Sequence, residues 1–161
     1  KDKFRADNIG IIFQQFNLLP YLSALDNVLL PLEFSKPRKT SLGKTKEKLN
    51  AEAKRLLKSL GIEPETIGGQ KAATLSIGQQ QRVAAARAFI GSPNMIIADE
   101  PTSSLDEETQ DKFLEQLFSQ KKITGASLLM VSHNPRIAKR FDRLIKLENI
   151  CDISHEEEKV K

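Results

Sequence analysis

Two adjacent acids, Asp99 and Glu100, follow a short apolar run at residues 95–98 and precede Pro101. An apolar run of this length predicts a buried strand, and parallel sheets bind their ligands beyond the carboxyl ends of the strands. Mg²⁺ prefers oxygen ligands, so Asp99 could hold the ion while Glu100 acts as a base toward a water that attacks a phosphate. The same two acids could instead only cap a helix or form a turn after the strand.

A serine and a glutamine three residues apart, Ser76 and Gln79, enclose Ile77 and Gly78 ahead of a helix-forming sequence. This S-x-x-Q spacing is typical of a capping box, in which the two side chains satisfy the first amide groups of a helix. A helix N-terminus with bare amides and a serine hydroxyl can also bind an anionic phosphate, and a glycine lets the phosphate approach the backbone closely. The two interpretations are compatible.

His133 and Gln14 also follow apolar runs, at residues 128–131 and 9–13. An imidazole at the end of a strand could contact the terminal phosphate of a nucleotide, although a single histidine there is more often a surface or capping residue. The amide oxygen of Gln14 could touch Mg²⁺ or the attacking water. Neither residue indicates a site by itself.

The elements that must position these side chains alternate between strand and helix. Apolar runs predict four buried strands and periodic apolar positions predict five helices, while Pro31 and Pro37 mark the exit of the first helix. The alternation predicts an α/β fold with a parallel sheet covered on both faces, and the helical stretch between Gln14 and Leu75 predicts an inserted helical subdomain. The predicted strands are residues 9–13, 95–98, 128–131 and 144–147, and the predicted helices are residues 23–28, 45–60, 79–90, 107–121 and 135–141.

The composition of the chain restricts its class. With 161 residues, 39% of them hydrophobic, the sequence has enough apolar material for one globular domain. No apolar run approaches the roughly 20 residues that a membrane-spanning helix needs, and the charged N-terminus does not resemble a signal peptide. The single cysteine, Cys151, permits no internal disulfide and fits a reducing compartment. We therefore expect a soluble, cytoplasmic protein.

The formal net charge of +4 is concentrated in a basic run at residues 36–48. Such a run is usually a solvated face of the protein. A nucleic-acid partner is not expected, because no aromatic residues lie among the lysines to stack on bases.

Taken in their order along the chain, these motifs resemble those of the ABC ATPase family. Residues 12–20, IFQQFNLLP, match its glutamine loop, and residues 75–79, LSIGQ, match its LSGGQ signature. Residues 95–99 followed by Glu100 match its Walker B strand, and residues 104–106, SLD, match its D-loop. His133 within VSHN matches its switch histidine. The sequence FNLLPYLSALDNVLLPLEF is most similar to the subfamily that serves lipoprotein-releasing and macrolide-type exporters.

The resemblance implies a partial RecA-like P-loop NTPase core, a mainly parallel sheet, with an inserted ABC helical subdomain. Residues 1–15 and 92–152 would form the partial core, residues 16–91 the helical subdomain with the signature helix, and residues 153–161 a charged tail. The function implied is that of an ATP-binding and ATP-hydrolysing subunit of an ABC transporter. Such a subunit lies on the inner face of the cell membrane, and residues 16–27 would contact transmembrane permease subunits.

In this family two ATPase subunits pair head to tail, so that each ATP lies between the phosphate loop of one subunit and the signature of the other. The cofactors implied are ATP and Mg²⁺. The resemblance assigns catalysis to Glu100, His133 and Gln14, nucleotide binding to Ser76, Gly78, Gln79 and Asp106, and the metal to Asp99 and Gln14.

The sequence departs from the family pattern in two places. The 161 residues contain no G-x-x-x-x-G-K-[ST] phosphate loop, and residues 43–45, GKT, are no substitute because they lack the upstream glycine and a preceding buried strand. We therefore expect little or no ATPase activity from these residues alone, and, since the chain does not start with methionine, a fragment or a partly ordered longer protein. Ile77 replaces the first signature glycine, which is harmless if the backbone there has ordinary φ and weakens binding if φ is positive.

Two other functions remain open. The chain could be a non-catalytic partner module that completes the ATP site of another subunit. It could also be a soluble ABC-type ATPase of DNA repair or translation, but that class normally carries a long coiled coil or a second cassette, and the sequence shows neither.

Overall fold

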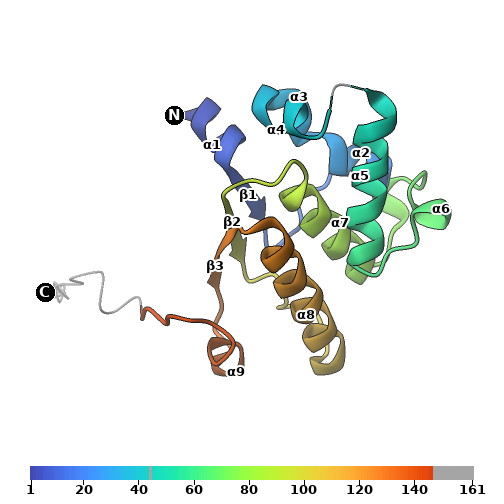
Figure 1. Ribbon diagram of the computed structural model, residues 1–161. Coiled ribbons are helices and arrows are strands. Elements are labelled where there is room, and N and C mark those ends of the chain that lie inside the picture. The colour runs from blue at the N-terminus through green and yellow to red at the C-terminus, as the bar shows by residue number, and fades with distance from the viewer. Residues whose placement is uncertain (44, 147–161) are drawn as a thin grey trace, which may run out of the picture. The chain divides into compact units, whose positions relative to one another are not determined.

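The computed structural model describes residues 1–43 and 45–146 (Figure 1). The chain divides into two compact units, Lys1–Val131 and Ser132–Lys161. None of the helices in the described ranges combines the length and the apolar character that crossing a bilayer requires. Cys151 and the charged tail at 153–161 lie outside the described residues.

The first unit is built on a three-stranded parallel sheet in the order β1 (Ile9–Ile12), β2 (Met95–Asp99) and β3 (Ser127–Val131). Its register pairs Ile9 with Met95 and Met95 with Ser127. Three of the four predicted strands are thus confirmed, together with the parallel sheet of an α/β fold. The fourth prediction, at 144–147, is wrong for its described part, because residues 144–146 form no strand and pair with no other described strand; residue 147 is not described.

One face of this sheet is buried under helix α7 (Ile77–Phe89). Gly10, Ile96 and Ala98 lie on this face, and all three are buried. A side chain at Gly10 would place its Cβ only 2.1 Å from the carbonyl oxygen of Ala88. Glycine at this position therefore allows the alanine-rich helix to lie directly on β1.

The opposite face of the sheet is open in the described part of the chain. Side chains alternate between the two faces along each strand. Met95, Leu129 and Val131 lie on the open face and are 36%, 50% and 53% exposed. The expectation that both faces are covered is therefore wrong for the described residues, because α7 packs on one face and nothing described packs on the other. We call this surface the open face; its apolar members are Ile9, Ile11, Phe13, Met95, Ile97, Leu129 and Val131.

Helices occupy most of the chain between β1 and β2, as predicted (Figure 1). Helix α2 begins after Ser23, whose hydroxyl accepts a hydrogen bond from the amide of Asp26 at 3.0 Å. In α5, one side carries the buried Leu49, Leu56 and Leu57 and packs on α2 and α7. The elements between β1 and α7 are α2 (Ala24–Leu29), α3 (Pro31–Phe34), α4 (Lys36–Ser41), α5 (Lys46–Ser59), α6 (Pro64–Ile67) and a 3₁₀ turn (Ala72–Thr74).

Three further helices complete the described chain. A helix that the sequence analysis did not predict, α1 (Asp2–Asn8), precedes β1. Helix α8 (Glu107–Thr124) links β2 to β3 and ends at Gly125 in the left-handed conformation. In the second unit, α9 (Pro135–Ala138) is shorter than the predicted helix 135–141.

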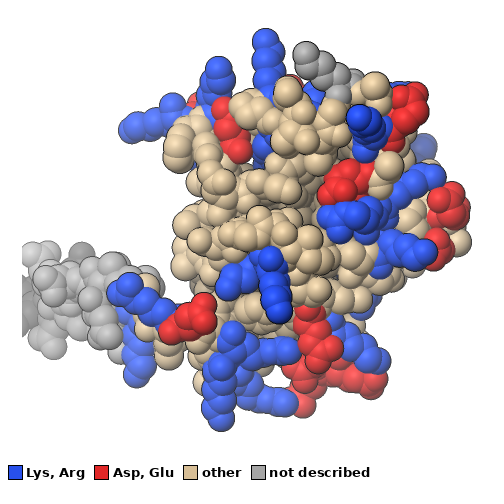
Figure 2. Space-filling model, viewed as in Figure 1, with Lys and Arg blue, Asp and Glu red and all other residues tan. Residues whose placement is uncertain are grey.

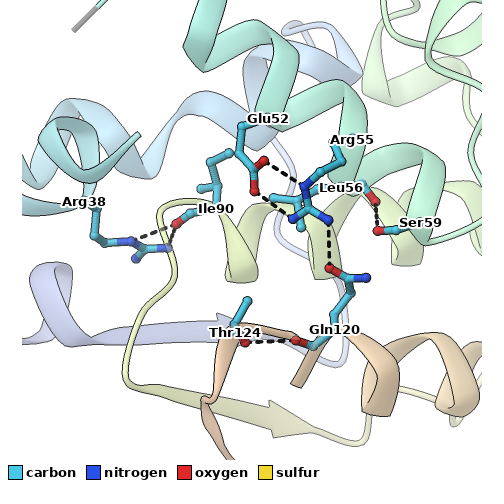
Figure 3. A network of polar contacts seen from close by, with 8 residues as sticks. All are labelled: Arg38, Glu52, Arg55, Leu56, Ser59, Ile90, Gln120 and Thr124. Carbon is cyan, nitrogen blue, oxygen red and sulfur yellow. Dashed lines mark hydrogen bonds and ion pairs between the residues drawn. The ribbon is translucent and has the colours of Figure 1, made fainter. Parts of the chain in front are cut away.

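The basic run at residues 36–48 is not only a solvated face. It contains α4, and Arg38 in that helix is 4% exposed. Its guanidinium donates a hydrogen bond to the carbonyl oxygen of Ile90 at 2.9 Å (Figure 3). It also donates to the carbonyl oxygens of Ala88 (3.1 Å) and Ala6 (3.3 Å). Burial lowers the pKa of Arg38 to about 10, although Asp7 acts in the opposite direction. Arg38 is buried because it satisfies carbonyl groups at the end of α7 that have no helical partner.

Apart from Arg38, the described charged side chains of this run lie at the surface. Lys39 of the same run pairs with Glu33 at 2.7 Å, and both side chains are solvent-exposed. On the face shown in Figure 2, lysine and arginine side chains are interspersed with acidic ones.

Candidate functional site

The carboxyl ends of β1, β2 and β3 lie at one edge of the sheet, because the strands are parallel and Ile12, Ala98 and Met130 are in register. Gln14 lies in the turn two residues after β1, Asp99 is the last residue of β2, and Glu100 follows it. The structure thus brings Gln14, Asp99 and Glu100 to the same edge. We call it the catalytic edge.

Asp99 belongs to the open face. It lies on the same face of β2 as Ile97 and Met95, two and four residues earlier, and its register partner Val131 is exposed. The carboxylate is exposed as well, at the end of an apolar surface that α7 does not cover. A phosphate group and its metal ion could approach Asp99 from this side without displacing any described element.

Glu100 leaves the strand in a left-handed backbone conformation, with φ of +43°. Its amide donates to the carbonyl oxygen of Val131 at 3.0 Å, and its own carbonyl accepts from the amide of Ser103 at 3.2 Å. Positive φ is uncommon for residues other than glycine, and such residues are concentrated at functional sites. The sharp turn directs residue 100 away from the strand path that Asp99 still follows.

The loop between β2 and α8, residues 100–106, is held at three points. The carbonyl oxygen of Pro101 accepts a hydrogen bond from Gln81 of α7. The buried hydroxyl of Thr102 accepts from Gln110 of α8 at 2.7 Å. Asp106, at the end of the loop, caps α8. A loop held in this way keeps Glu100 in a defined position at the catalytic edge.

Asp106 uses both carboxylate oxygens within its own chain. One oxygen accepts from the amide of Thr109 at 2.9 Å and the other from the Thr109 hydroxyl at 2.8 Å. The amide hydrogen bond, followed by the hydroxyl hydrogen bond, lowers the pKa of Asp106. The carboxylate is exposed and ionised, so it stabilises the start of α8 whatever else it contacts.

The signature residues form the predicted capping box at the start of α7. The amide of Gln79 donates to the Ser76 hydroxyl at 3.3 Å, and the amide of Ser76 donates to the Gln79 side chain at 2.9 Å. Ile77 is the first helical residue, with an ordinary helical backbone, and its side chain is 57% exposed. The isoleucine therefore introduces no backbone strain here.

Gly78 is not required by the fold of this chain. A Cβ at this position would lie 3.5 Å from Arg82, which is an ordinary contact. Its place is in the first turn of α7, where any residue can adopt the backbone conformation. A glycine that the chain itself does not need is consistent with close approach of something outside the chain.

The glutamine loop is tied to α7 by a buried arginine. Phe16 and Asn17 both have positive φ, +60° and +47°. The guanidinium of Arg87 donates to the carbonyl oxygens of both residues, and burial lowers the pKa of Arg87. Further along, Asn27 of α2 accepts from the amide of Leu19 at 2.8 Å and donates to its carbonyl oxygen at 3.0 Å.

Sequence reasoning missed these buried polar groups. Gln81, Arg87 and Asn27 are polar residues on the inner sides of otherwise apolar helices, which was the available signal. Their partners are backbone atoms of distant segments, and residue spacing does not predict such pairs.

His133 is not one of the residues that the first unit brings to the catalytic edge. It lies in the second unit, directly after Ser132. Its place relative to Asp99 and Glu100 is not described. The predicted role of His133 therefore stays a prediction.

The donors at the catalytic edge suit a hard metal ion that keeps most of its water. Among the described residues, no three histidine, cysteine, aspartate or glutamate side chains gather into a metal-binding cluster. Mg²⁺ is commonly held by one or two protein oxygens together with substrate phosphates. The carboxylate of Asp99 and the amide oxygen of Gln14 fit that pattern in chemical type.

Comparison with known proteins gives consistent results. Residues 1–103 match the family described as "ABC transporter". The "Uncharacterized ABC transporter ATP-binding protein YbbA" of Escherichia coli is 42% identical over 147 residues, which are 91% of this chain and 60% of that protein. The "Lipoprotein-releasing system ATP-binding protein LolD" of Novosphingobium aromaticivorans is 38% identical over 143 residues, 89% of this chain and 60% of that protein.

A solved structure is similar over most of the chain. It is described as the "Dimeric structure of a post-hydrolysis state of the ATP-binding cassette MJ0796 bound to ADP and Pi". The TM-score is 0.74 at 40% sequence identity, covering 86% of this chain and 57% of that one. MJ0796 is a protein of Methanocaldococcus jannaschii. The chain thus spans about 60% of the length of these relatives.

Proposed function

The chain belongs to the ABC transporter family, and we propose that it is part of an ATP-binding and ATP-hydrolysing subunit that works as a head-to-tail dimer with membrane subunits. The observation that carries this proposal is the catalytic edge, where Gln14, Asp99 and Glu100 follow neighbouring parallel strands. The capped start of α7 adds the second half of the site, Ser76 to Gln79.

In this proposal the two halves act on different nucleotides. Glu100 accepts a proton from the water that attacks the terminal phosphate, and Gln14 helps to orient that water. Asp99, with Gln14, holds Mg²⁺, which neutralises charge on the phosphates when bound. His133 contacts the terminal phosphate. The signature residues Ser76, Gly78 and Gln79, with Asp106, contact the nucleotide held by the second ATPase subunit.

The open face supports the proposal that these residues form only part of a catalytic core. In an α/β fold, parallel sheets are normally covered on both faces. We assign residues 1–15 and 92–152 to the partial core, 16–91 to the helical subdomain and 153–161 to a charged tail. The remaining elements of a complete cassette, including the phosphate loop, would cover the part of the open face formed by β2 and β3 and bring the nucleotide phosphates to Asp99.

A groove beside β1 suits a membrane partner. It has a volume of about 310 Å³ and is lined mainly by apolar side chains, including Phe13, Leu30, Pro31 and Phe34, with Asn17 of the glutamine loop at its wall. We propose that it receives a short, largely apolar helix from a transmembrane permease subunit. The groove overlaps the predicted contact range 16–27 at Asn17 and extends it to Phe34. In this proposal the face that carries the groove would lie toward the inner side of the membrane.

Reconstitution tests the proposed function. In a chimera, the segment of the MJ0796 cassette that precedes its match to this chain is joined in front of Lys1. We expect ATP hydrolysis by the chimera, reduced at least about 100-fold by Glu100→Gln because the base is lost. A chimera that folds and binds ATP but hydrolyses it no faster than its Glu100→Gln variant would refute the proposal.

A mixing experiment separates the non-catalytic alternative. The 161-residue chain is added to an intact MJ0796 cassette whose signature serine has been replaced, and ATP turnover is measured. Turnover restored by the chain, but not by its Ser76→Ala variant, shows that the signature half is functional. If the chimera is inactive and the mixture is active, the chain only completes the site of another subunit.

A further inference from the structure

Helix α7 bonds through its side chains to both the loop after β1 and the loop after β2. We propose that Gln81 and Arg87 are positioning residues, through which the signature helix fixes both loops of the catalytic edge. The consequence for hydrolysis rests on the proposed function, but the positioning itself can be tested without ATP.

Gln81 connects α7 to the residue after Glu100. Its side chain is 0% exposed, and its Nε2 donates to the carbonyl oxygen of Pro101. Its Oε1 is buried with no hydrogen-bond partner in the described residues. A buried acceptor without a partner destabilises a fold, and a methionine would fill a similar volume without it. Stability alone therefore does not account for a glutamine here, whereas fixing the Pro101 carbonyl does.

Arg87 plays the corresponding part for the glutamine loop. Two of its nitrogens donate to the carbonyl oxygens of Phe16 and Asn17, the two positive-φ residues that follow Gln14 and Gln15. A planar guanidinium can hold two adjacent carbonyls in one fixed geometry, which an ammonium group cannot. The arginine therefore stabilises a backbone shape that is unfavourable for Phe16 in particular.

The two bonds belong to a single helix of 13 residues. Its N-terminus carries Ser76 and Gly78, the proposed contacts to the nucleotide of the partner subunit. A helix is rigid over this length, so a displacement at Ser76 moves Gln81 and Arg87 with it. Binding of the partner's nucleotide at Ser76 would then shift the loops that carry Gln14 and Glu100 in the subunit to which Ser76 belongs.

The first test measures amide hydrogen exchange in the 161-residue chain. The amides of Ser103 and Leu105 donate within the loop, to Glu100 and Thr102. In Gln81→Met we expect these two amides to exchange about tenfold faster, because the loop is no longer held at Pro101. The matched control is Gln120→Met: Gln120 is also a helical glutamine, 2% exposed, but it accepts from Arg55 of α5 at 3.4 Å (Figure 3).

A second variant keeps the test decisive if Gln81→Met unfolds. Gln81→Glu has nearly the same shape, but the side chain can donate to Pro101 only when it is protonated. Protection of Ser103 and Leu105, corrected for the intrinsic pH dependence of exchange, should therefore return as the pH is lowered. Protonation also removes the cost of a buried carboxylate, so a packing role would restore protection throughout the chain alike, whereas a positioning role restores it at Ser103 and Leu105 more than at amides elsewhere. Unchanged protection in Gln81→Met, or pH-independent protection in Gln81→Glu, overturns the inference and leaves the proposed function standing.

The second test measures turnover once the chimera shows Glu100-dependent hydrolysis. We expect Gln81→Met and Arg87→Lys to lower kcat about tenfold while KM for ATP changes less than about threefold. Their controls, Gln120→Met and Arg38→Lys, should keep kcat within about twofold of the parent. The comparison is made between test and control variants whose urea unfolding midpoints are similar. An active chimera with unchanged kcat in both test variants contradicts the role in hydrolysis. An inactive chimera contradicts the proposed function, and the exchange experiment still decides on positioning.

Discussion

The fold does not require Gly78, whereas it does use the side chain of Asp106. The backbone at Gly78 is ordinary helix with room for a methyl group. Asp106, in contrast, already uses both carboxylate oxygens on Thr109. Substitution of Gly78 should therefore affect binding more than stability, and substitution of Asp106 should affect stability in a pH-dependent way.

We expect Gly78→Ala to leave the free energy of unfolding unchanged or to raise it by up to about 1 kcal/mol, since alanine is the better helix former. Urea unfolding of the chain measures this. In the mixing experiment the same variant should restore less ATP turnover than the parent chain, because a methyl group faces the partner's nucleotide. A loss of stability would show that the fold does need this glycine.

The folded-state pKa of Asp106 lies below the model-compound value of 3.8. The stabilisation from its ionised form is therefore fully present above that value and is lost as the pH falls through the lower folded pKa. Asp106→Asn keeps a capping oxygen but removes the charge. We expect the stability advantage of the parent chain over Asp106→Asn, measured by urea unfolding, to shrink as the pH falls below 3.8 and through the lower folded-state pKa. A constant difference would rule out this carboxylate as the source.

At this scale, local pairs are predictable and distant pairs are not. The capping box of Ser76 and Gln79 follows from a spacing of three residues and is confirmed. The partner of Arg87 lies about 70 residues away along the chain, at the backbone of Asn17. Backbone acceptors carry no residue-type signal, so no sequence pattern could have indicated that bond.

At the scale of elements, the contact between α7 and β1 depends on one missing side chain. Gly10→Ala would place a Cβ 2.1 Å from the carbonyl oxygen of Ala88, which is backbone and cannot simply rotate away. We expect the free energy of unfolding to fall by about 1–3 kcal/mol, the usual cost of overpacking. The control is Gly69→Ala, where the new Cβ meets nothing within 4 Å. Equal urea midpoints for the two variants would contradict this close packing.

The sequence predicted the strands and longer helices of the first unit but missed α1, α3, α4 and α6. Pro31 and Pro37 were interpreted as helix exits, whereas each lies in the first turn of a helix. Proline fits there because its missing N–H would have no partner in any case. Four residues of α3 and six of α4 are too few for a periodic pattern, and the contacts that hold them, such as those of the buried Arg38, join distant segments of the chain.

At the scale of the whole chain, the open face distinguishes two adjacent isoleucines of β2. Ile96 is 0% exposed under α7, whereas Ile97 is only half-buried on the open face. We expect Ile96→Thr to lower the free energy of unfolding by about 2 kcal/mol, because a hydroxyl replaces buried apolar volume. Ile97→Thr should cost less than about 1 kcal/mol and should weaken concentration-dependent self-association, since exposed apolar patches promote it.

Urea unfolding and sedimentation velocity of both variants test this pair. Reversed stability effects would mean that the sheet is covered on the other side. The sequence could not have predicted the open face, because strands 9–12 and 95–99 are as apolar as strands buried on both sides. An apolar run indicates that a strand is suited to burial. It does not indicate whether another described element covers that strand.

The position of β1 in the chain also has a consequence for how the sheet assembles. Met95 finds its partner Ser127 across a single helix, whereas Ile9 reaches Met95 only after every helix from α2 to α7. Closing the longer loop costs more chain entropy, and distant pairings form slowly. We therefore expect the β2–α8–β3 segment to acquire its ladder first and β1 to join last. The glutamine loop, attached to the end of β1, would be the last part of the catalytic edge to fold.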